Sequence, residues 1–174
     1  LEIRYKNMTH EGDVMPAYYG ETANSCKLED CLRKAADMIG WEKKPLRQVM
    51  PDGKIRGLGT AMAMQGSAIS NCDVGSVTIK LSDEGFYNVI IGCTDMGTGC
   101  DTIIAQFVAD SLDTDIDNIA VFGVDTDTSP YDSGSYASST TYLTGMAAVK
   151  AAEQMREKLL QLAAKILEED ITKL

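Results

Sequence analysis

Histidine is nearly absent from this sequence, and basic residues are scarce. The only histidine among the 174 residues is His10, which stands in an irregular segment without a second histidine as companion. A single histidine argues against histidine-based catalysis and against a His-rich metal site. The 16 lysines and arginines are outnumbered by 26 aspartates and glutamates, which gives a net charge of −10. Because so acidic a chain is repelled by a phosphate backbone, we expect no nucleic-acid partner.

Long apolar runs and proline are also in short supply. No stretch approaches the ~18 uninterrupted apolar residues of a transmembrane helix, so we expect no membrane partner. With 44% hydrophobic residues and only 4 prolines, the composition is that of a folded domain. The 5 cysteines form no CxxC pair, and the opening residues do not resemble a signal peptide. Together these features predict a reduced, cytoplasmic protein.

The hydrophobic pattern predicts an α+β fold. Residues 1–26 have no clear period and are expected to form an extended arm, whereas residues 27–174 are expected to form one domain. A helix is expected over 27–39, capped by Ser25 and ended by Gly40.

The strands of the expected sheet follow this helix. Residues 57–70 are small and apolar, which predicts a buried strand. Residues 76–82 alternate between polar and apolar and are followed by a turn and the apolar run 86–91, which predicts a β-hairpin. The later elements are a helix over 101–112, a strand over 117–124 and a long helix over 143–166. The result is a mixed sheet with a β-hairpin and a helical crossover, packed against helices.

The first candidate site is the glycine-rich turn 97–99, just before a predicted helix. Glycines allow close approach of a ligand, and the free amides of a helix start favour an anionic group. Thr102 stands where a dinucleotide-binding fingerprint needs its third glycine, and no P-loop lysine follows. The alternative is an ordinary turn with Asp101 as the helix cap. Cys93 and Cys100 flank the turn without partners at zinc spacing and are expected to be small buried residues.

The second candidate site is the hydroxyl-rich loop 125–145, which leads into the last helix. Hydroxyls and free amides at a helix start suit a phosphate or another anionic ligand. Asp125 and Asp127 have calcium-loop spacing, but Pro130 and Tyr136 stand where an EF-hand needs glycine and glutamate. The alternative is a solvated loop rich in turn-forming residues.

Three segments in succession carry a family resemblance. They are GLGTAMAMQGSAIS, IGCTDMGTGCDT and DTDTSPYDSGSYASSTTYLTGMAAVKAA. In order and separation they resemble the molybdenum-cofactor-binding subunit of the xanthine dehydrogenase and aldehyde oxidase family, over residues 56–157. The resemblance implies part of a molybdopterin-binding domain, internal to a longer subunit. The family's catalytic glutamate lies in a Gly-x-Gly-Glu-Pro motif that this sequence lacks, so no catalytic residue is expected here.

The resemblance also implies a cofactor site. Both loops would contact one molybdopterin, in a dinucleotide form, that carries molybdenum, and no protein ligand to the metal is expected. Thr98 stands where the family usually has glutamine. Residues 65–69 would help to wall the substrate cavity. The residues assigned to the cofactor are Gly97, Thr98, Gly99, Ser135, Ala137, Ser138 and Thr140.

The family's reaction is the hydroxylation of a purine, another N-heterocycle or an aldehyde with oxygen derived from water. Electrons leave through iron–sulfur clusters and FAD on other domains or subunits, so the implied partners are these, the rest of the subunit and a small-molecule substrate. This chain alone is expected to be inactive. Two other classes stay open: a nucleotide- or phosphate-binding module without a redox role, and a structural α+β interaction domain.

Overall fold

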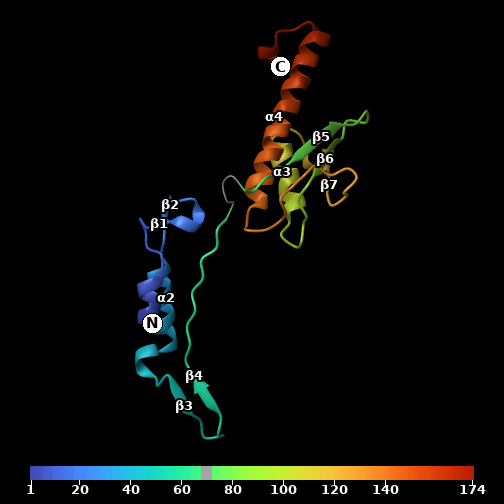
Figure 1. Ribbon diagram of the computed structural model, residues 1–174. Coiled ribbons are helices and arrows are strands. Elements are labelled where there is room, and N and C mark those ends of the chain that lie inside the picture. The colour runs from blue at the N-terminus through green and yellow to red at the C-terminus, as the bar shows by residue number, and fades with distance from the viewer. Residues whose placement is uncertain (68–71) are drawn as a thin grey trace. The chain divides into compact units, whose positions relative to one another are not determined.

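The chain folds as two compact units, Leu1–Gln65 and Gly66–Leu174. The computed structural model shown in Figure 1 describes residues 1–67 and 72–174. The division between the compact units falls after Gln65 and does not coincide with the predicted boundary after residue 26. Each unit is described by itself below.

The first unit is built from short elements. The expected extended arm over 1–26 is wrong in its local structure, because it contains a helix and a small antiparallel hairpin. These elements are too short to leave a readable hydrophobic period. In chain order the unit comprises α1 (Glu2–Asn7), β1 (Val14–Met15), η1 (Pro16–Tyr18), β2 (Glu21–Thr22), α2 (Leu28–Ile39), η2 (Trp41–Lys43), β3 (Arg47–Val49) and β4 (Ile55–Gly57).

Helix α2 follows the prediction closely. It ends at Gly40, whose φ of 71° is the left-handed conformation that a C-terminal glycine provides. Its buried residues, Leu32 and Ala36, lie on the predicted apolar face. Ser25 is not its cap, because Lys27 occupies the N-cap position and makes no side-chain cap hydrogen bond.

The buried strand expected over 57–70 is wrong where the structure describes it. Strand β4 ends at Gly57, where it pairs with β3, and residues 58–67 have no regular secondary structure. All of residues 58–67 are exposed or half-exposed. Residues 68–70 lie outside the described residues. A segment of small apolar side chains and glycines can resemble a buried strand in composition. Because such side chains bury little apolar area, they stabilise pairing within a sheet only weakly.

The second unit confirms the α+β fold. Its sheet has the order β5-β6-β7; β5 and β6 form an antiparallel hairpin, and β6 and β7 are parallel. The parallel pair is connected through α3, which is the predicted helical crossover. The elements are β5 (Val77–Leu81), β6 (Tyr87–Ile91), α3 (Cys100–Leu112), η3 (Ile116–Asn118), β7 (Ile119–Phe122), α4 (Thr140–Leu167) and η4 (Ile171–Lys173).

The core of this unit lies between the central strand and the two helices. Val89 and Ile91 of β6 are fully buried, together with Ile104 of α3 and Ala148 of α4. Gly145 lets the helices approach closely, because a Cβ there would lie 2.5 Å from the ring of Phe107. The core therefore fixes the end of β6 and the starts of α3 and α4, where both candidate loops begin or end.

Helix α4 is long but not membrane-like. Its 28 residues run past the sheet toward the C-terminus (Figure 1). Within residues 1–67 and 72–174, no helix combines the length and the apolar character needed to cross a bilayer.

Candidate functional site

The two candidate loops are fastened to each other. The amide of Thr94, just after β6, donates to Ser135 Oγ at 2.9 Å, and that hydroxyl donates to the Thr94 carbonyl at 2.9 Å. Gly92 allows this approach, because a Cβ there would lie 2.5 Å from the carbonyl oxygen of Pro130. Ser133 makes a similar connection to Val74, whose amide donates to the Ser133 hydroxyl at 3.0 Å.

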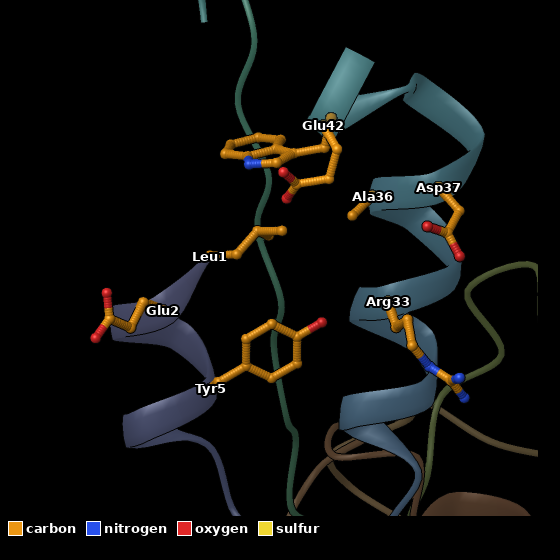
Figure 2. Close-up of a pocket in the computed structure, with 8 residues that line it drawn as sticks. Leu1, Glu2, Tyr5, Arg33, Ala36, Asp37 and Glu42 are labelled. Atoms are coloured by element: carbon orange, nitrogen blue, oxygen red, sulfur yellow. The ribbon is translucent and has the colours of Figure 1, made fainter. Parts of the chain in front are cut away.

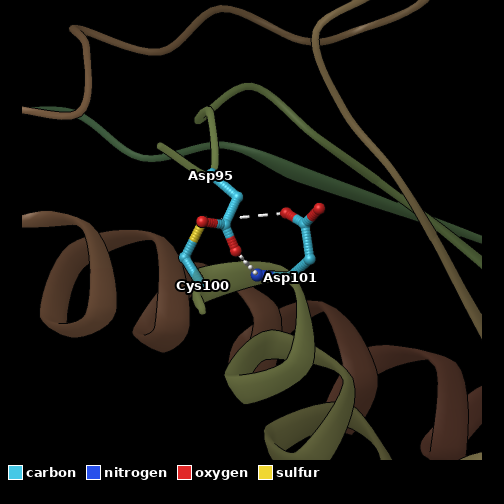
Figure 3. A group of neighbouring side chains, drawn as sticks. All are labelled: Asp95, Cys100 and Asp101. Carbon is cyan, nitrogen blue, oxygen red and sulfur yellow. Dashed lines mark hydrogen bonds between the residues drawn. The ribbon is translucent and has the colours of Figure 1, made fainter. Parts of the chain in front are cut away.

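A carboxylate outside the predicted site residues, that of Asp95, organises the glycine turn. Asp95 Oδ1 accepts the amides of Gly97 at 2.8 Å, Thr98 at 3.0 Å and Gly99 at 3.2 Å. Its Oδ2 accepts the amide of Asp101 at 3.5 Å, as Figure 3 shows. These bonds, the one from Gly97 foremost, hold the pKa of Asp95 below its ordinary value. Asp101 is therefore not the helix cap; Asp95 accepts the turn amides before α3 and one amide of its first turn, that of Asp101.

The starts of α3 and α4 differ in how their backbone amides are bonded. Before α3, the amides of the glycine turn are already bonded to Asp95, which also accepts the Asp101 amide in the first turn of the helix. At α4 the N-cap residue Ser139 makes no side-chain cap hydrogen bond, and its hydroxyl donates instead to the Tyr136 carbonyl at 2.7 Å. The first-turn amides of α4, from Thr140 to Tyr142, cannot bond within the helix. The start of α4 is the better place for an anion.

Both loops line one pocket of about 390 Å³. Five of the seven predicted cofactor residues line it, one from the first loop and four from the second. The other two, Gly97 and Gly99, do not, although no described neighbouring atom lies within 4 Å of where either Cβ would stand. The lining residues are Met96, Thr98, Ser135, Tyr136, Ala137, Ser138, Thr140 and Thr141.

In the second loop, two residues that line this pocket have a left-handed backbone conformation. Ala137 and Ser138 both have positive φ, 50° and 53°, a conformation that costs energy in residues other than glycine. Tyr136 fixes the loop just before them, because its hydroxyl donates to the carboxylate of Asp73, which raises the pKa of Tyr136. Asp132 fixes it from within, accepting the Thr144 hydroxyl at 3.1 Å.

The two cysteines beside the first loop are buried, as predicted. Cys93 and Cys100 are each 1% exposed. Burial raises the pKa of both thiols, that of Cys100 to about 12. Single ligand atoms of Asp95, Cys100 and Asp101 lie within 4.8 Å of one another (Figure 3). A protonated thiol and a carboxylate engaged by amides are poor metal ligands, which favours a capping role for this cluster.

A pocket of about 420 Å³ in the first unit has a different character. Tyr5 reaches from α1 toward α2 across it (Figure 2). Arg33, at its edge, already donates to Asp30 at 2.7 Å. None of the predicted cofactor residues lines it, so the pocket between the two loops of the second unit is the candidate site.

An α+β domain whose loops present neutral donors at one pocket is a candidate binding domain for an anionic ligand, and comparison with known proteins identifies the family. The profile of the molybdopterin cofactor-binding domain matches residues 34–174. The chain therefore belongs to the molybdopterin cofactor-binding domain family, as the motifs predicted.

Named relatives agree with this assignment. The chain is 38% identical to a probable hypoxanthine oxidase, XdhD, from Escherichia coli strain K12, over 98% of this chain and 19% of that protein. It is 32% identical to the xanthine dehydrogenase molybdenum-binding subunit of Escherichia coli O157:H7, over 96% of this chain and 23% of that protein. The chain thus spans about a fifth of the length of these relatives.

A solved structure shares the fold. The crystal structure of a Cu,Mo-CO dehydrogenase superposes with a TM-score of 0.57 at 22% sequence identity, covering 98% of this chain and 24% of that one.

The pocket residues fit the anionic cofactor that the family implies. None of the residues lining the pocket is a lysine, an arginine or an acid. Hydroxyls and the open amides at the start of α4 are the neutral donors that hold phosphate groups at helix starts. On the first loop the fit rests on Thr98 and on the open space beside the glycines, because the loop amides are bonded to Asp95.

Proposed function

We propose that the pocket between Thr98 and the segment 135–141 holds the molybdopterin of a molybdenum hydroxylase. One observation carries the proposal: two loops far apart in the sequence line the same pocket, beside a helix start whose N-cap residue, Ser139, makes no side-chain cap hydrogen bond. The residues proposed to hold the cofactor are Gly97, Thr98, Gly99, Ser135, Ala137, Ser138 and Thr140.

These residues have different roles in the proposal. The hydroxyls of Thr98, Ser138 and Thr140 donate to polar groups of the cofactor. Ser135 acts as a positioning residue, because its hydroxyl already donates to Thr94 and accepts from it. Ala137 contributes its left-handed backbone, which brings the loop round into the start of α4.

The phosphate groups of the cofactor bind at the start of α4 in this proposal. The first-turn amides there carry the positive end of the helix dipole, which favours negative charge. The row of hydroxyls over 135–141 offers more donors than a single phosphate needs, which supports a dinucleotide form with a pyrophosphate.

When bound, the cofactor would provide the chemistry for hydroxylating an electron-poor carbon with oxygen from water. The residues of this chain orient the cofactor and exclude water from one side of it. A relative named as a probable hypoxanthine oxidase supports a purine as substrate, ahead of another N-heterocycle or an aldehyde. The five cysteines are all free thiols, which supports the cytoplasm as the compartment.

Other parts of a larger assembly complete the reaction in this proposal. The chain corresponds to about a fifth of the length of its relatives, and its sequence contains no Gly-x-Gly-Glu-Pro motif. We infer that it is one part of a longer subunit that supplies the glutamate base and the remaining cofactor contacts. Iron–sulfur clusters and FAD on other domains or subunits take the electrons.

The test is the molybdenum and pterin content of that longer subunit. Thr98→Val and Thr140→Val each remove one hydroxyl with little change in shape, and each should lower retained pterin about tenfold, since a hydrogen bond to a charged group contributes ~1.5–3 kcal/mol. Thr128→Val is the matched control, because Thr128 is exposed on the same loop but does not line the pocket. A wild-type subunit without molybdenum and pterin contradicts the proposal, as do three variants with equal content.

A further inference from the structure

The segment just before β5 is held against the second loop and α4. The amide of Val74 donates to Ser133 Oγ at 3.0 Å, and the amide of Ser133 donates to the Val74 carbonyl at 3.1 Å. Gly75 lies against α4, because a Cβ there would stand 2.7 Å from the backbone of Thr144. Asp73 therefore adjoins residues whose backbone is fixed relative to the second loop.

Tyr136 of the second loop is hydrogen-bonded at each of its polar groups. Its hydroxyl donates to the carboxylate of Asp73, and its amide donates to the Gly134 carbonyl at 2.9 Å. Its carbonyl accepts the Ser139 amide at 3.1 Å and the Ser139 hydroxyl at 2.7 Å. Of these four bonds, the one to Asp73 is the one that reaches outside the second loop.

The ring of Tyr136 forms part of the proposed cofactor pocket. Tyr136 lines that pocket, whereas no residue of the segment 73–75 does. Because Tyr136 is 46% exposed, packing alone does not fix its ring, and the bond from its hydroxyl sets where the ring stands. The next two residues, Ala137 and Ser138, have positive φ, a conformation that persists where surrounding contacts enforce it.

We propose that Asp73 is a positioning residue for the cofactor and acts through Tyr136. The inference rests on the proposed function. By accepting the phenol hydroxyl, Asp73 fixes the ring of Tyr136 at the pocket and, through it, the turn at 137–138. The segment 73–75 thus supports the pocket without lining it, and its loss should weaken cofactor binding rather than the fold.

The experiment measures retained pterin in the longer subunit for a set of variants at this contact. Tyr136→Phe and Asp73→Ala should each lower the pterin content about fivefold, the effect of one ordinary hydrogen bond. The double variant should lose no more than either single variant, because all three lack the same bond. Asp73→Asn should keep at least about half of the wild-type content, since its side-chain carbonyl can accept the phenol hydroxyl.

Two controls separate positioning from a purely structural role. Tyr131→Phe is the matched control for Tyr136→Phe, because Tyr131 is on the same loop, is 73% exposed and does not line the pocket. Hydrogen exchange of β6 and α3 peptides reports on the fold. It should stay within about twofold of the wild type in Tyr136→Phe, since neither Tyr136 nor Asp73 belongs to the buried core of the described residues.

The role of Asp73 and the proposed function fail on different results. Wild-type pterin content in Tyr136→Phe overturns the role, as do losses that add in the double variant or an Asp73→Asn content as low as that of Asp73→Ala. Pterin loss with equally accelerated exchange in β6 and α3 also overturns it. If Asp73→Ala does not fold, Tyr136→Phe and Asp73→Asn give the answer. A wild-type subunit without pterin contradicts the proposed function itself, and the role of Asp73 with it.

Discussion

Replacing Gly92 by alanine should separate the two loops of the candidate site. The Cβ of an alanine there would lie 2.5 Å from the carbonyl oxygen of Pro130 and 2.6 Å from Cβ of Asp132. Two carbon atoms are best separated by ~3.5–4.0 Å, so the segment around Asp132 must move by about 1 Å. Both contacts are with atoms close to the backbone of the second loop, which cannot rotate away as a long side chain could.

The expected cost is set by two opposing effects. Overpacking of a close contact destabilises by ~1–3 kcal/mol. Restricting the unfolded chain at a former glycine stabilises by ~0.4–1 kcal/mol. The free energy of unfolding of the second unit should therefore fall by about 1–2 kcal/mol, which is a ~5–30-fold larger open fraction.

Hydrogen exchange of α3 and β6 peptides measures this change directly. Exchange in Gly92→Ala should be roughly 5–30-fold faster than in the wild type. Gly123→Ala is the control within the same unit, since its Cβ would stand 3.1 Å from its nearest neighbours and should cost less than about 1 kcal/mol. Exchange in Gly92→Ala that is no faster than in Gly123→Ala would refute the close approach of the two loops.

Four further predictions follow from the same unit. The buried thiols of Cys93 and Cys100 should resist iodoacetamide at about pH 8 in the native protein, while the exposed cysteines react; equal labelling would contradict their burial. Because its folded pKa lies below the ordinary 3.8, Asp95 stabilises its turn above that pH, and amide protection at 97–99 should be lost as the pH falls through the lowered pKa. Ile104→Ala should lower the free energy of urea unfolding by ~2–5 kcal/mol, since Ile104 is fully buried. Gly99→Val should lower the molybdenum content of the longer subunit, because a β-branched residue disfavours the φ of 77° found there. Full molybdenum content in this variant would show that the turn has no role in holding the cofactor.

The sequence allowed the second unit to be predicted because its elements are long and periodic. The hairpin at β5–β6, the crossover helix α3 and the long helix α4 each carry several apolar residues at regular spacing. The first unit could not be predicted in this way. Its two-residue strands and the helix Glu2–Asn7 are set by local turns and contacts that leave little pattern.

The site was predicted in part for a similar reason. Hydroxyls and glycines before helices are visible in the sequence, and Thr98, Ser138 and Thr140 do meet at one pocket. The role of Asp95 was missed because Asp101 stands nearer to the helix start, although an aspartate two residues before a glycine is a known signal for amide capping. The contact of Asp73 with Tyr136 joins residues far apart in the chain, which no local pattern indicates.

The central claim is that one cofactor contacts both loops at once. Hydrogen exchange of the longer subunit, compared with and without its molybdenum cofactor, tests this most directly. Exchange should be slower with cofactor in the segments 96–99 and 135–141, with no change in the exposed turn at residues 83–85 of the β5–β6 hairpin. Slower exchange in only one of the two segments, or in neither, would contradict the shared site.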